Sequence, residues 1–258
     1  MPEGDTIHRL ARRMNAALGG HEIEVAEAPN PRSPLHGRAS VLAGRALESA
    51  EARGKHLLAH FSDGLVLHSH LGMNGRWSIT ADGPSPYSNP WLRLASGGAT
   101  ATQRGGQTLR LISEGRTRND PSLRRLGPDP LRSGFEVAAA AARLQSLGRG
   151  REIGEALLDQ EIIAGIGNAI RVEALFQARV SPWRKVDELS SAELDAVVGE
   201  NAEVMRIGLE TGRRPSSIYG GGRRRCPACH GRIVSRGQGD DNRIAYWCPR
   251  CQPGPAPG

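Results

Sequence analysis

The segment His56-Leu-Leu-Ala-His-Phe-Ser-Asp-Gly-Leu-Val-Leu-His-Ser-His-Leu71 shows how the first half of the chain folds. Its two ends are strand-like runs, residues 56–61 and 65–71, and Ser62-Asp63-Gly64 between them is typical of a hairpin turn. In the second run leucines alternate with Val66, His68 and His70, which predicts a strand with one apolar face. Strand-like patterns continue from about residue 22 to residue 113, so we expect a β-rich first half.

A helix is predicted before these strands and a loop within them. Residues 5–18 carry apolar side chains at helical spacing, with Asp5 or Thr6 as the cap and Gly19-Gly20 as the stop. Residues 84–102 are rich in Pro, Gly and Ser, which predicts a long loop.

The second half of the chain has the periodicity of helices. A turn-rich hinge at Gly127-Pro128-Asp129-Pro130 separates it from the strands, and Gly212–Arg225 reads as a flexible linker. Helices are predicted at residues 135–147, 153–158, 168–178 and 192–209. We therefore expect three domains, at residues 1–130, 131–222 and 223–258, the last ending in a disordered tail from Pro253 to Gly258.

The charge of the chain is concentrated at one end. The net charge is +7, and the residues from Arg213 onward, with nine arginines and two aspartates, account for all of it. Such an excess favours a polyanionic partner, with nucleic acid the leading candidate and a solvated basic tail the alternative. The sequence has no apolar run of about 20 residues and no secretory signal at its start, so we expect an intracellular protein.

All four cysteines lie near the C-terminus. Cys226-x2-Cys229 and Cys248-x2-Cys251 are separated by 18 residues, a spacing that predicts one tetrahedral, structural Zn²⁺. Two disulfides are the alternative, and Cys226-Pro-Ala-Cys229-His230 also fits a c-type haem attachment, but nothing indicates export. Between the pairs we expect a two-stranded hairpin with Arg243 near its tip.

Motifs along the whole chain resemble the formamidopyrimidine-DNA glycosylase/endonuclease VIII family. They are Met1-Pro2-Glu3-Gly4, Gly54-Lys55-His56-Leu57-Leu58, His70-Leu71-Gly72-Met73-Asn74-Gly75, Leu157-Leu158-Asp159-Gln160, Ile163-Ala164-Gly165-Ile166-Gly167-Asn168, Glu173-Ala174-Leu175-Phe176 and the cysteine hairpin. The resemblance implies an α+β multidomain fold: an N-terminal β-sandwich with a helix, a helix-two-turn-helix domain that binds DNA, and a C-terminal zinc finger. It also implies a bifunctional DNA glycosylase and AP lyase of base excision repair.

The resemblance assigns four catalytic residues. Removal of Met1 would leave the amine of Pro2 as the nucleophile, and an α-amino group with a pKa of about 8 is partly neutral at neutral pH. Glu3 would donate a proton to the sugar, Lys55 would assist β-elimination and Arg243 would contact phosphate and assist δ-elimination. Lys55 is one of only two lysines among 34 basic residues, as suits an amine that must lose its proton. Each role has a plainer alternative. Pro2 could belong to an ordinary N-terminus, Glu3 could be a surface carboxylate at a helix start, and Arg243 could be one more phosphate contact.

The resemblance also marks residues that would contact DNA. Asn168 would hold a phosphate, with a plain N-cap as the compatible alternative. Arg125 would contact DNA, and Met73, Arg124 and Leu126 are candidates to fill the space of a flipped base. For Met73 and Leu126 the alternative is an ordinary core residue.

The start of the chain and residues 125–129 resemble the endonuclease VIII branch, which favours oxidised pyrimidines over oxidised purines as substrates. Asp5 departs from both branches. We expect a monomer in the bacterial cytoplasm or nucleoid, with damaged DNA as its partner. A catalytically silent DNA-binding protein would lack Pro2, Glu3 or Lys55, and a zinc-ribbon interaction protein would leave the N-terminal motif unexplained.

Overall fold

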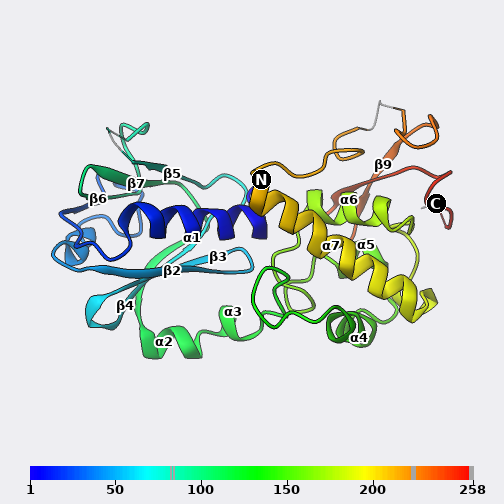
Figure 1. Cartoon of the computed structure of the whole chain (residues 1–258), viewed down its shortest axis with the longest axis horizontal. Coiled ribbons are helices and arrows are strands. Elements are labelled where there is room, and N and C mark those ends of the chain that lie inside the picture. The colour runs from blue at the N-terminus through cyan, green and yellow to red at the C-terminus, as the bar shows by residue number, and fades with distance from the viewer. Residues whose placement is uncertain (82, 84, 222–224, 256–258) are drawn as a thin grey trace. The chain divides into compact units, whose positions relative to one another are not determined.

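The computed structural model describes residues 1–81, 83, 85–221 and 225–255. The chain forms two compact units, Met1–Arg124 and Arg125–Gly258 (Figure 1). Strands predominate in the first unit, and helices with one small hairpin make up the second. None of the helices in the described part of the chain is long and apolar enough to cross a membrane.

The first unit begins with helix α1, Gly4–Leu18. The helix buries Ile7, Leu10, Met14 and Leu18, whose spacing of three or four residues puts them on one face. Asp5 or Thr6 was expected as the cap, and this is wrong: Glu3 is the N-cap, without a side-chain capping bond. The helix thus starts one residue before the predicted residue 5, and Gly4 and Asp5 are buried in its first turn.

Two antiparallel four-stranded sheets enclose the core of the first unit. One has the order β1-β6-β7-β5 and the other β2-β3-β4-β8. Their bounds are β1 Val25–Glu27, β2 Leu47–Arg53, β3 His56–Phe61, β4 Leu65–His70, β5 Arg76–Thr80, β6 Leu92–Ser96, β7 Ala99–Arg104 and β8 Thr108–Ser113. Side chains such as Leu57 and Phe61 from one sheet and Leu94 from the other join α1 in a single apolar cluster. Short 3₁₀ turns occupy Ala39–Leu42 and Ser62–Gly64.

The prediction of a continuous loop over residues 84–102 is wrong. Strands β6 and β7 lie in the second part of that stretch and pair from Leu92↔Gln103 to Ser96↔Ala99. Gly97 and Gly98 make the turn between them with φ of +55° and +86°. The many turn-forming residues of this stretch favoured a loop, although Leu92 and Leu94 alternate as in a strand. Both leucines are fully buried. Pro84 itself lies outside the described residues.

Two short helices follow β8: α2, Glu114–Asn119, and α3, Pro121–Arg124. Ser113 caps α2 by accepting a hydrogen bond from the backbone N–H of Arg116. Helix α2 packs against β4 and β8, and Thr117 and Leu123 are buried.

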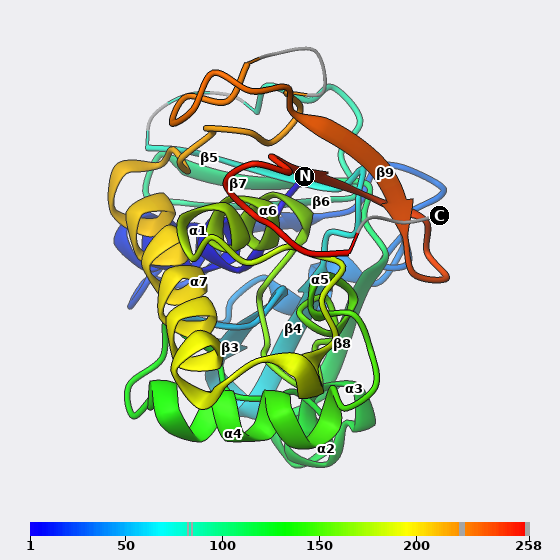
Figure 2. The same cartoon turned by 90° about the vertical axis from the view of Figure 1, so that its right-hand side faces the viewer.

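In its described residues the second unit has four α-helices: α4 Val137–Leu147, α5 Ile153–Ala156, α6 Asn168–Gln177 and α7 Ser191–Thr211. Helix α7 packs against both α4 and α6 (Figure 2). Ser190 and Glu193 form a capping box at its start, and Gly212, with a φ of +73°, ends it. A 3₁₀ turn, Val186–Glu188, precedes α7, and the hairpin β9 Val234–Gln238 and β10 Arg243–Trp247 follows it.

The stretch after α7 is anchored, where the sequence predicted a flexible linker. The Glu173 carboxylate accepts hydrogen bonds from the backbone N–H groups of Ser217, Ile218 and Tyr219, at 2.7–3.0 Å. Ile218 is fully buried. Residues 222–224 of the predicted linker and residues 256–258 of the predicted disordered tail lie outside the described residues. Within that tail, the carbonyl of Pro255 accepts a hydrogen bond from the Ser181 hydroxyl.

Candidate functional site

The predicted nucleophile and proton donor lie at the start of α1. Pro2 is half-buried, and Glu3 directly before the helix is 1% exposed. The alternative of a surface carboxylate is therefore wrong for Glu3. A carboxyl group withdrawn from water is suited to hold or give a proton to a group next to it.

Lys55 lies in the turn between β2 and β3, after Gly54 with its φ of +57°. Its side chain is near His70, the last residue of β4. Burial lowers the pKa of His70 and the Lys55 ammonium lowers it further, while the Gln107 side chain opposes both. Sheet pairing places His70 opposite His56, so the turn that carries Lys55 lies beside two imidazoles.

Met73 lies in the loop between β4 and β5 and is 61% exposed. The alternative of a core methionine is wrong. The loop closes tightly, because the backbone N–H of Gly75 donates to the Leu71 carbonyl at 2.9 Å. A Cβ on Gly75 would lie 2.5 Å from that oxygen, so only glycine fits this turn. The loop thus presents an apolar side chain to solvent.

The other two wedge candidates, Arg124 and Leu126, and the predicted DNA contact Arg125 lie where the two units join in sequence. Arg124 ends α3 in the first unit and is exposed. Arg125, in the second unit, is also exposed and pairs with Glu161 at 3.4 Å. Leu126 is half-buried, so it is not a plain core residue.

Asn168 is the first residue of α6 and is 8% exposed. The N-cap is Gly167, so the alternative of an Asn N-cap is wrong. Its amide nitrogen donates to the carbonyl of Ile244 in β10, and its amide oxygen accepts from Arg171, both at 2.9 Å. A primary amide has a second hydrogen, so Asn168 keeps a donor beyond this bond. The residue therefore joins the helix to the cysteine hairpin.

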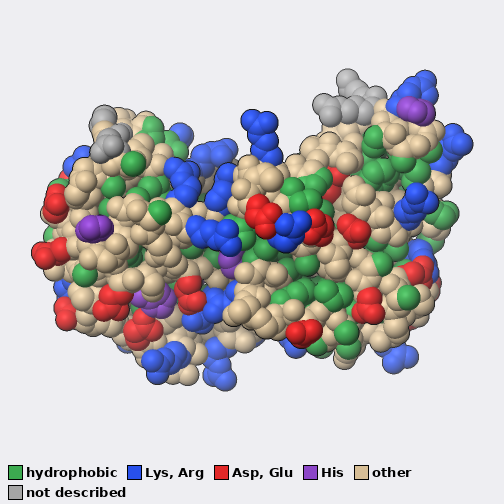
Figure 3. Space-filling view, viewed as in Figure 1, with side chains coloured by type: hydrophobic (Ala, Val, Ile, Leu, Met, Phe, Trp, Pro, Cys, Tyr) green, Lys and Arg blue, Asp and Glu red, His purple; other side chains and the backbone are tan. Residues whose placement is uncertain are grey.

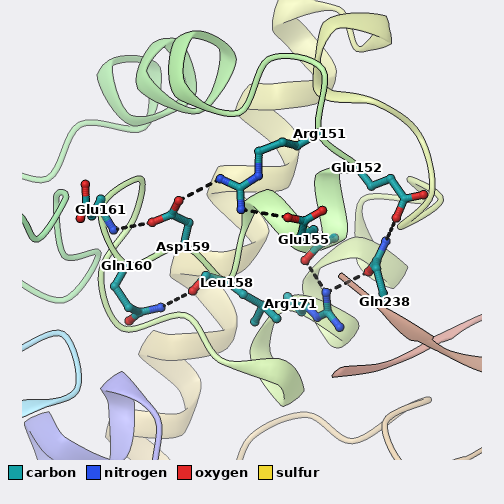
Figure 4. A network of polar contacts seen from close by, with 10 residues as sticks. Arg151, Glu152, Glu155, Leu158, Asp159, Gln160, Glu161, Arg171 and Gln238 are labelled. Atoms are coloured by element: carbon teal, nitrogen blue, oxygen red, sulfur yellow. Dashed lines mark hydrogen bonds and ion pairs between the residues drawn. The ribbon is translucent and has the colours of Figure 1, made fainter. Parts of the chain in front are cut away.

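Arg171 is 1% exposed and is the centre of this junction (Figure 4). Its guanidinium donates to the carbonyls of Gly154 and Arg243, the latter at 3.2 Å, and to the side chain of Gln238 at 2.9 Å. Gln238 in turn donates to Glu152 at 2.8 Å and to a main-chain carbonyl. The sequence analysis missed these residues. One signal could have indicated Arg171. It is a charged residue in a mostly apolar helix that is buried on nearly every side, so it needs buried partners.

Arg243, the predicted elimination residue, is the first residue of β10 and pairs with Gln238 in β9. Its carbonyl is held by Arg171, whereas its side chain is 35% exposed with Nε 4.0 Å from a carboxylate oxygen of Asp241. The backbone at this position is thus fixed, and the guanidinium projects from a rigid support.

The four cysteines form one cluster. Their Sγ atoms all lie within 4.8 Å of one another, with Cys226–Cys251 at 3.7 Å and Cys229–Cys248 at 3.5 Å. An S–S bond is about 2.05 Å, so the alternative of two disulfides is wrong. Tetrahedral zinc with Zn–S bonds of about 2.3 Å places its sulfurs about 3.8 Å apart, which fits the cluster. The backbone N–H of Gly231 bonds to Cys229 Sγ and lowers the pKa of that thiol to about 7, which favours a thiolate ligand.

The predicted site residues are therefore divided between the two units. The first holds Pro2, Glu3, Lys55, Met73 and Arg124, and the second holds Arg125, Asn168, Arg243 and the cysteines. Lys and Arg side chains lie on the viewed face of both units (Figure 3).

Family models match both units. The N-terminal domain of formamidopyrimidine-DNA glycosylase matches residues 1–111, and the H2TH domain of the same enzyme matches residues 126–219. Endonuclease 8 1 of Mycobacterium tuberculosis H37Rv is 34% identical over 98% of this chain and 100% of the relative. Probable endonuclease 8 2 of Streptomyces coelicolor is 36% identical over 100% of this chain and 96% of the relative.

Solved structures show the same fold. Lactococcus lactis Fpg in complex with DNA containing N7-benzyl-Fapy-dG has a TM-score of 0.83 at 23% identity, over 98% of this chain and 100% of that one. The predicted fold class, a β-sandwich with a helix, a helix-two-turn-helix domain and a cysteine hairpin, is confirmed. The chain belongs to the formamidopyrimidine-DNA glycosylase/endonuclease VIII family of DNA N-glycosylases with AP lyase activity.

Proposed function

We propose that this chain excises oxidised bases, pyrimidines in preference to purines, through the amine of Pro2, and then cuts the strand by β,δ-elimination. The observation that carries the proposal is the buried Glu3 carboxyl directly beside Pro2 at the start of α1. An amine adjoining a proton donor out of bulk water is what imine chemistry at a sugar requires.

The first step exchanges one bond at the sugar for another. Removal of Met1 frees the Pro2 amine, which then bonds to C1′ as the N-glycosidic bond breaks; the base leaves with the proton that the amine loses. Glu3 protonates the ring oxygen, the ring opens, and the C1′ adduct becomes an iminium.

The second step cuts the strand. Lys55 removes a proton from C2′, and the iminium takes up the electron pair to become an enamine. The enamine electrons then form a C2′–C3′ double bond and expel the 3′-phosphate, which restores a conjugated iminium. Loss of a C4′ proton then expels the 5′-phosphate, with Arg243 balancing the charge of the leaving group. Water hydrolyses the remaining imine and returns the Pro2 amine.

DNA is the proposed partner, and the protein is proposed to act as a monomer on the bacterial nucleoid in the cytoplasm. The structural relatives from Lactococcus lactis are complexes with damaged or abasic DNA, one of them with an oxidised pyrimidine. Asn168 and Arg125 would bind phosphate, and Met73, with Arg124, would fill the space of the flipped base. Met73 suits this role because it is exposed on a tight loop.

Zinc is the proposed metal, bound by Cys226, Cys229, Cys248 and Cys251. With four protein ligands it would be structural, and it would stabilise the hairpin that carries Arg243.

Borohydride trapping on DNA tests the nucleophile. Wild-type protein mixed with DNA that contains an oxidised pyrimidine should form a covalent complex visible on a denaturing gel. Pro2→Gly, or a chain extended before Pro2, should lose the complex. Trapping that survives with Pro2 blocked would show that another amine attacks. On the same DNA without borohydride, Arg243→Ala should spare base excision and impair strand cutting, and equal loss of both would assign Arg243 to DNA binding alone.

A further inference from the structure

A polar relay lies on the face of the β2-β3-β4-β8 sheet that carries His56, His68 and His70. Arg110 in β8 pairs with His68 in β4 and donates from Nε to His68 Nδ1 at 3.1 Å. His68 Nε2 lies 2.9 Å from His56 Nδ1. At the other end, the Arg110 guanidinium forms an ion pair with Asp120, which follows α2.

The relay has a fixed direction because arginine only donates hydrogen bonds. His68 Nδ1 must accept from Arg110, so the His68 proton is on Nε2. That proton is donated to His56 Nδ1, so the His56 proton is on Nε2 as well. Each ring is therefore held in one tautomer by its neighbour.

The relay ends at the predicted elimination residue. The His56 ring packs on the His70 ring with centroids 4.6 Å apart, and the Lys55 ammonium is close enough to His70 to lower its pKa. Lys55 and His56 are also consecutive in the chain. A continuous series of contacts thus leads from Asp120 through two oriented imidazoles to the surroundings of Lys55.

We propose that His68 and His56 are positioning residues for Lys55: their oriented rings fix His70 and the β2–β3 turn, and the β-elimination step depends on them. This inference rests on the proposed role of Lys55. A charged imidazole at either position would break the relay, because a proton on His68 Nδ1 would face the Arg110 donor.

The surroundings keep both rings neutral. The pKa of His56 is lowered to about 3, chiefly by burial and then by the neighbouring His70 and His68. Asp120 raises this pKa, and Arg110 lowers it. Burial first, then Arg110, lowers the pKa of His68 to about 4, against the attraction of Asp120. Both pKa values lie below the neutral range, so both rings are neutral there, and His68 is 1% exposed to solvent.

Strand cutting at a preformed abasic site, measured under single-turnover conditions, tests the proposal. We expect His68→Leu to slow cleavage about ten-fold, as loss of alignment at an acid–base group does, with unchanged borohydride trapping on the same DNA. His68→Gln should restore the rate to within about two-fold, because a primary amide supplies the acceptor and the donor that the relay needs.

A matched control and a double variant make the test specific. His60 is on the same sheet face but pairs with Glu51 and Glu114, so His60→Leu should leave cleavage unchanged. In a Lys55→Ala background, His68→Leu should cause no further loss. The proposal is overturned if His68→Leu cleaves like the wild type, if His68→Gln is as slow as His68→Leu, or if the losses multiply.

Two further measurements separate this inference from the proposed function. If wild-type protein shows no trapping, or Lys55→Ala cleaves normally, the proposed chemistry fails. Independently of activity, ¹⁵N NMR should show Nε2–H tautomers for His56 and His68, and Arg110→Met should remove that preference for His68. Arg110 is 42% exposed, so this variant is expected to fold even where His68→Leu does not. A mixed tautomer population in the wild type would refute the relay itself.

Discussion

The two units support their candidate residues in different ways. In the second unit, Asn168 and Arg243 are held through the buried Arg171, which donates to two main-chain carbonyls and two side-chain oxygens. In the first unit, Met73 stands on an exposed loop whose shape depends on backbone and glycine. Buried polar side chains therefore fix Asn168 and the Arg243 backbone, whereas local turn geometry fixes the loop that carries Met73.

The largest effect should come from the cysteine cluster. Cys248→Ser, or strong chelation, should remove the metal and unfold the hairpin, since zinc binding in small fingers is worth on the order of 10 kcal/mol. Metal analysis should give one zinc per wild-type chain, and limited proteolysis should then cut after residue 225. Ser235→Ala in β9 serves as the control. A hairpin that resists protease without metal would show that packing of Trp183 on Trp247 is sufficient.

Arg171→Met should be the next most damaging change. It leaves the Gly154 and Arg243 carbonyls and the Gln238 amide without their donor, which we expect to lower the free energy of unfolding by about 3 kcal/mol or more. Urea unfolding measures the loss. Arg206→Met, which removes an exposed ion pair with Glu203 and Glu210, should leave the free energy of unfolding nearly unchanged. Similar losses for both variants would show that the buried arginine contributes no more to stability than the exposed one.

The ion pair of Glu193 with Arg184 tests whether surface contacts in the second unit contribute less to stability than the buried contacts of Arg171. Hydrogen bonds from Arg184, then from Ser190, lower the pKa of Glu193 to about 2. Because the folded pKa is depressed, the stabilisation is present above pH 4.5 and is lost as the pH falls toward 2. Glu193→Gln should therefore lower stability by about 1 kcal/mol at pH 7. A difference from wild type that persists unchanged at pH 2 would contradict this origin.

Met73→Ala should have the smallest effect on folding, below about 0.5 kcal/mol, because the side chain is mostly in solvent. If Met73 fills the space of a flipped base, the variant should excise a damaged base more slowly from duplex than from single-stranded DNA. Gly75→Ala is the contrasting variant and should destabilise the loop, since its Cβ meets the Leu71 carbonyl. An equal loss on both DNA forms would argue against a wedge.

Local patterns in the sequence were sufficient for much of the architecture. The hairpin around Ser62-Asp63-Gly64, the helix at Asn168 and the cysteine cluster follow from periodicity and spacing alone. The residues that carry the candidate chemistry came from the family resemblance, because Pro2 and Glu3 have no distinctive local pattern.

Long-range polar contacts could not be foreseen. Arg171 meets Gln238 across 67 positions of sequence, and Glu173 meets Ser217 across 44. The sequence around either residue does not indicate its partner, because a buried charge is hydrogen-bonded by whichever groups the tertiary fold brings to it. Strands β6 and β7 were missed for a local reason, because glycine and proline nearby masked a short apolar alternation.

The bond from Arg171 to the carbonyl of Arg243 has a practical consequence for protein engineering. Arg171 binds the main-chain carbonyl of residue 243, which every amino acid has, so different side chains can be placed at this position without loss of that bond. Lysine, citrulline or a photocrosslinking residue could be installed there while the β9–β10 register is kept. The hairpin is thereby a platform on which the chemistry of a single side chain can be varied systematically against a constant backbone.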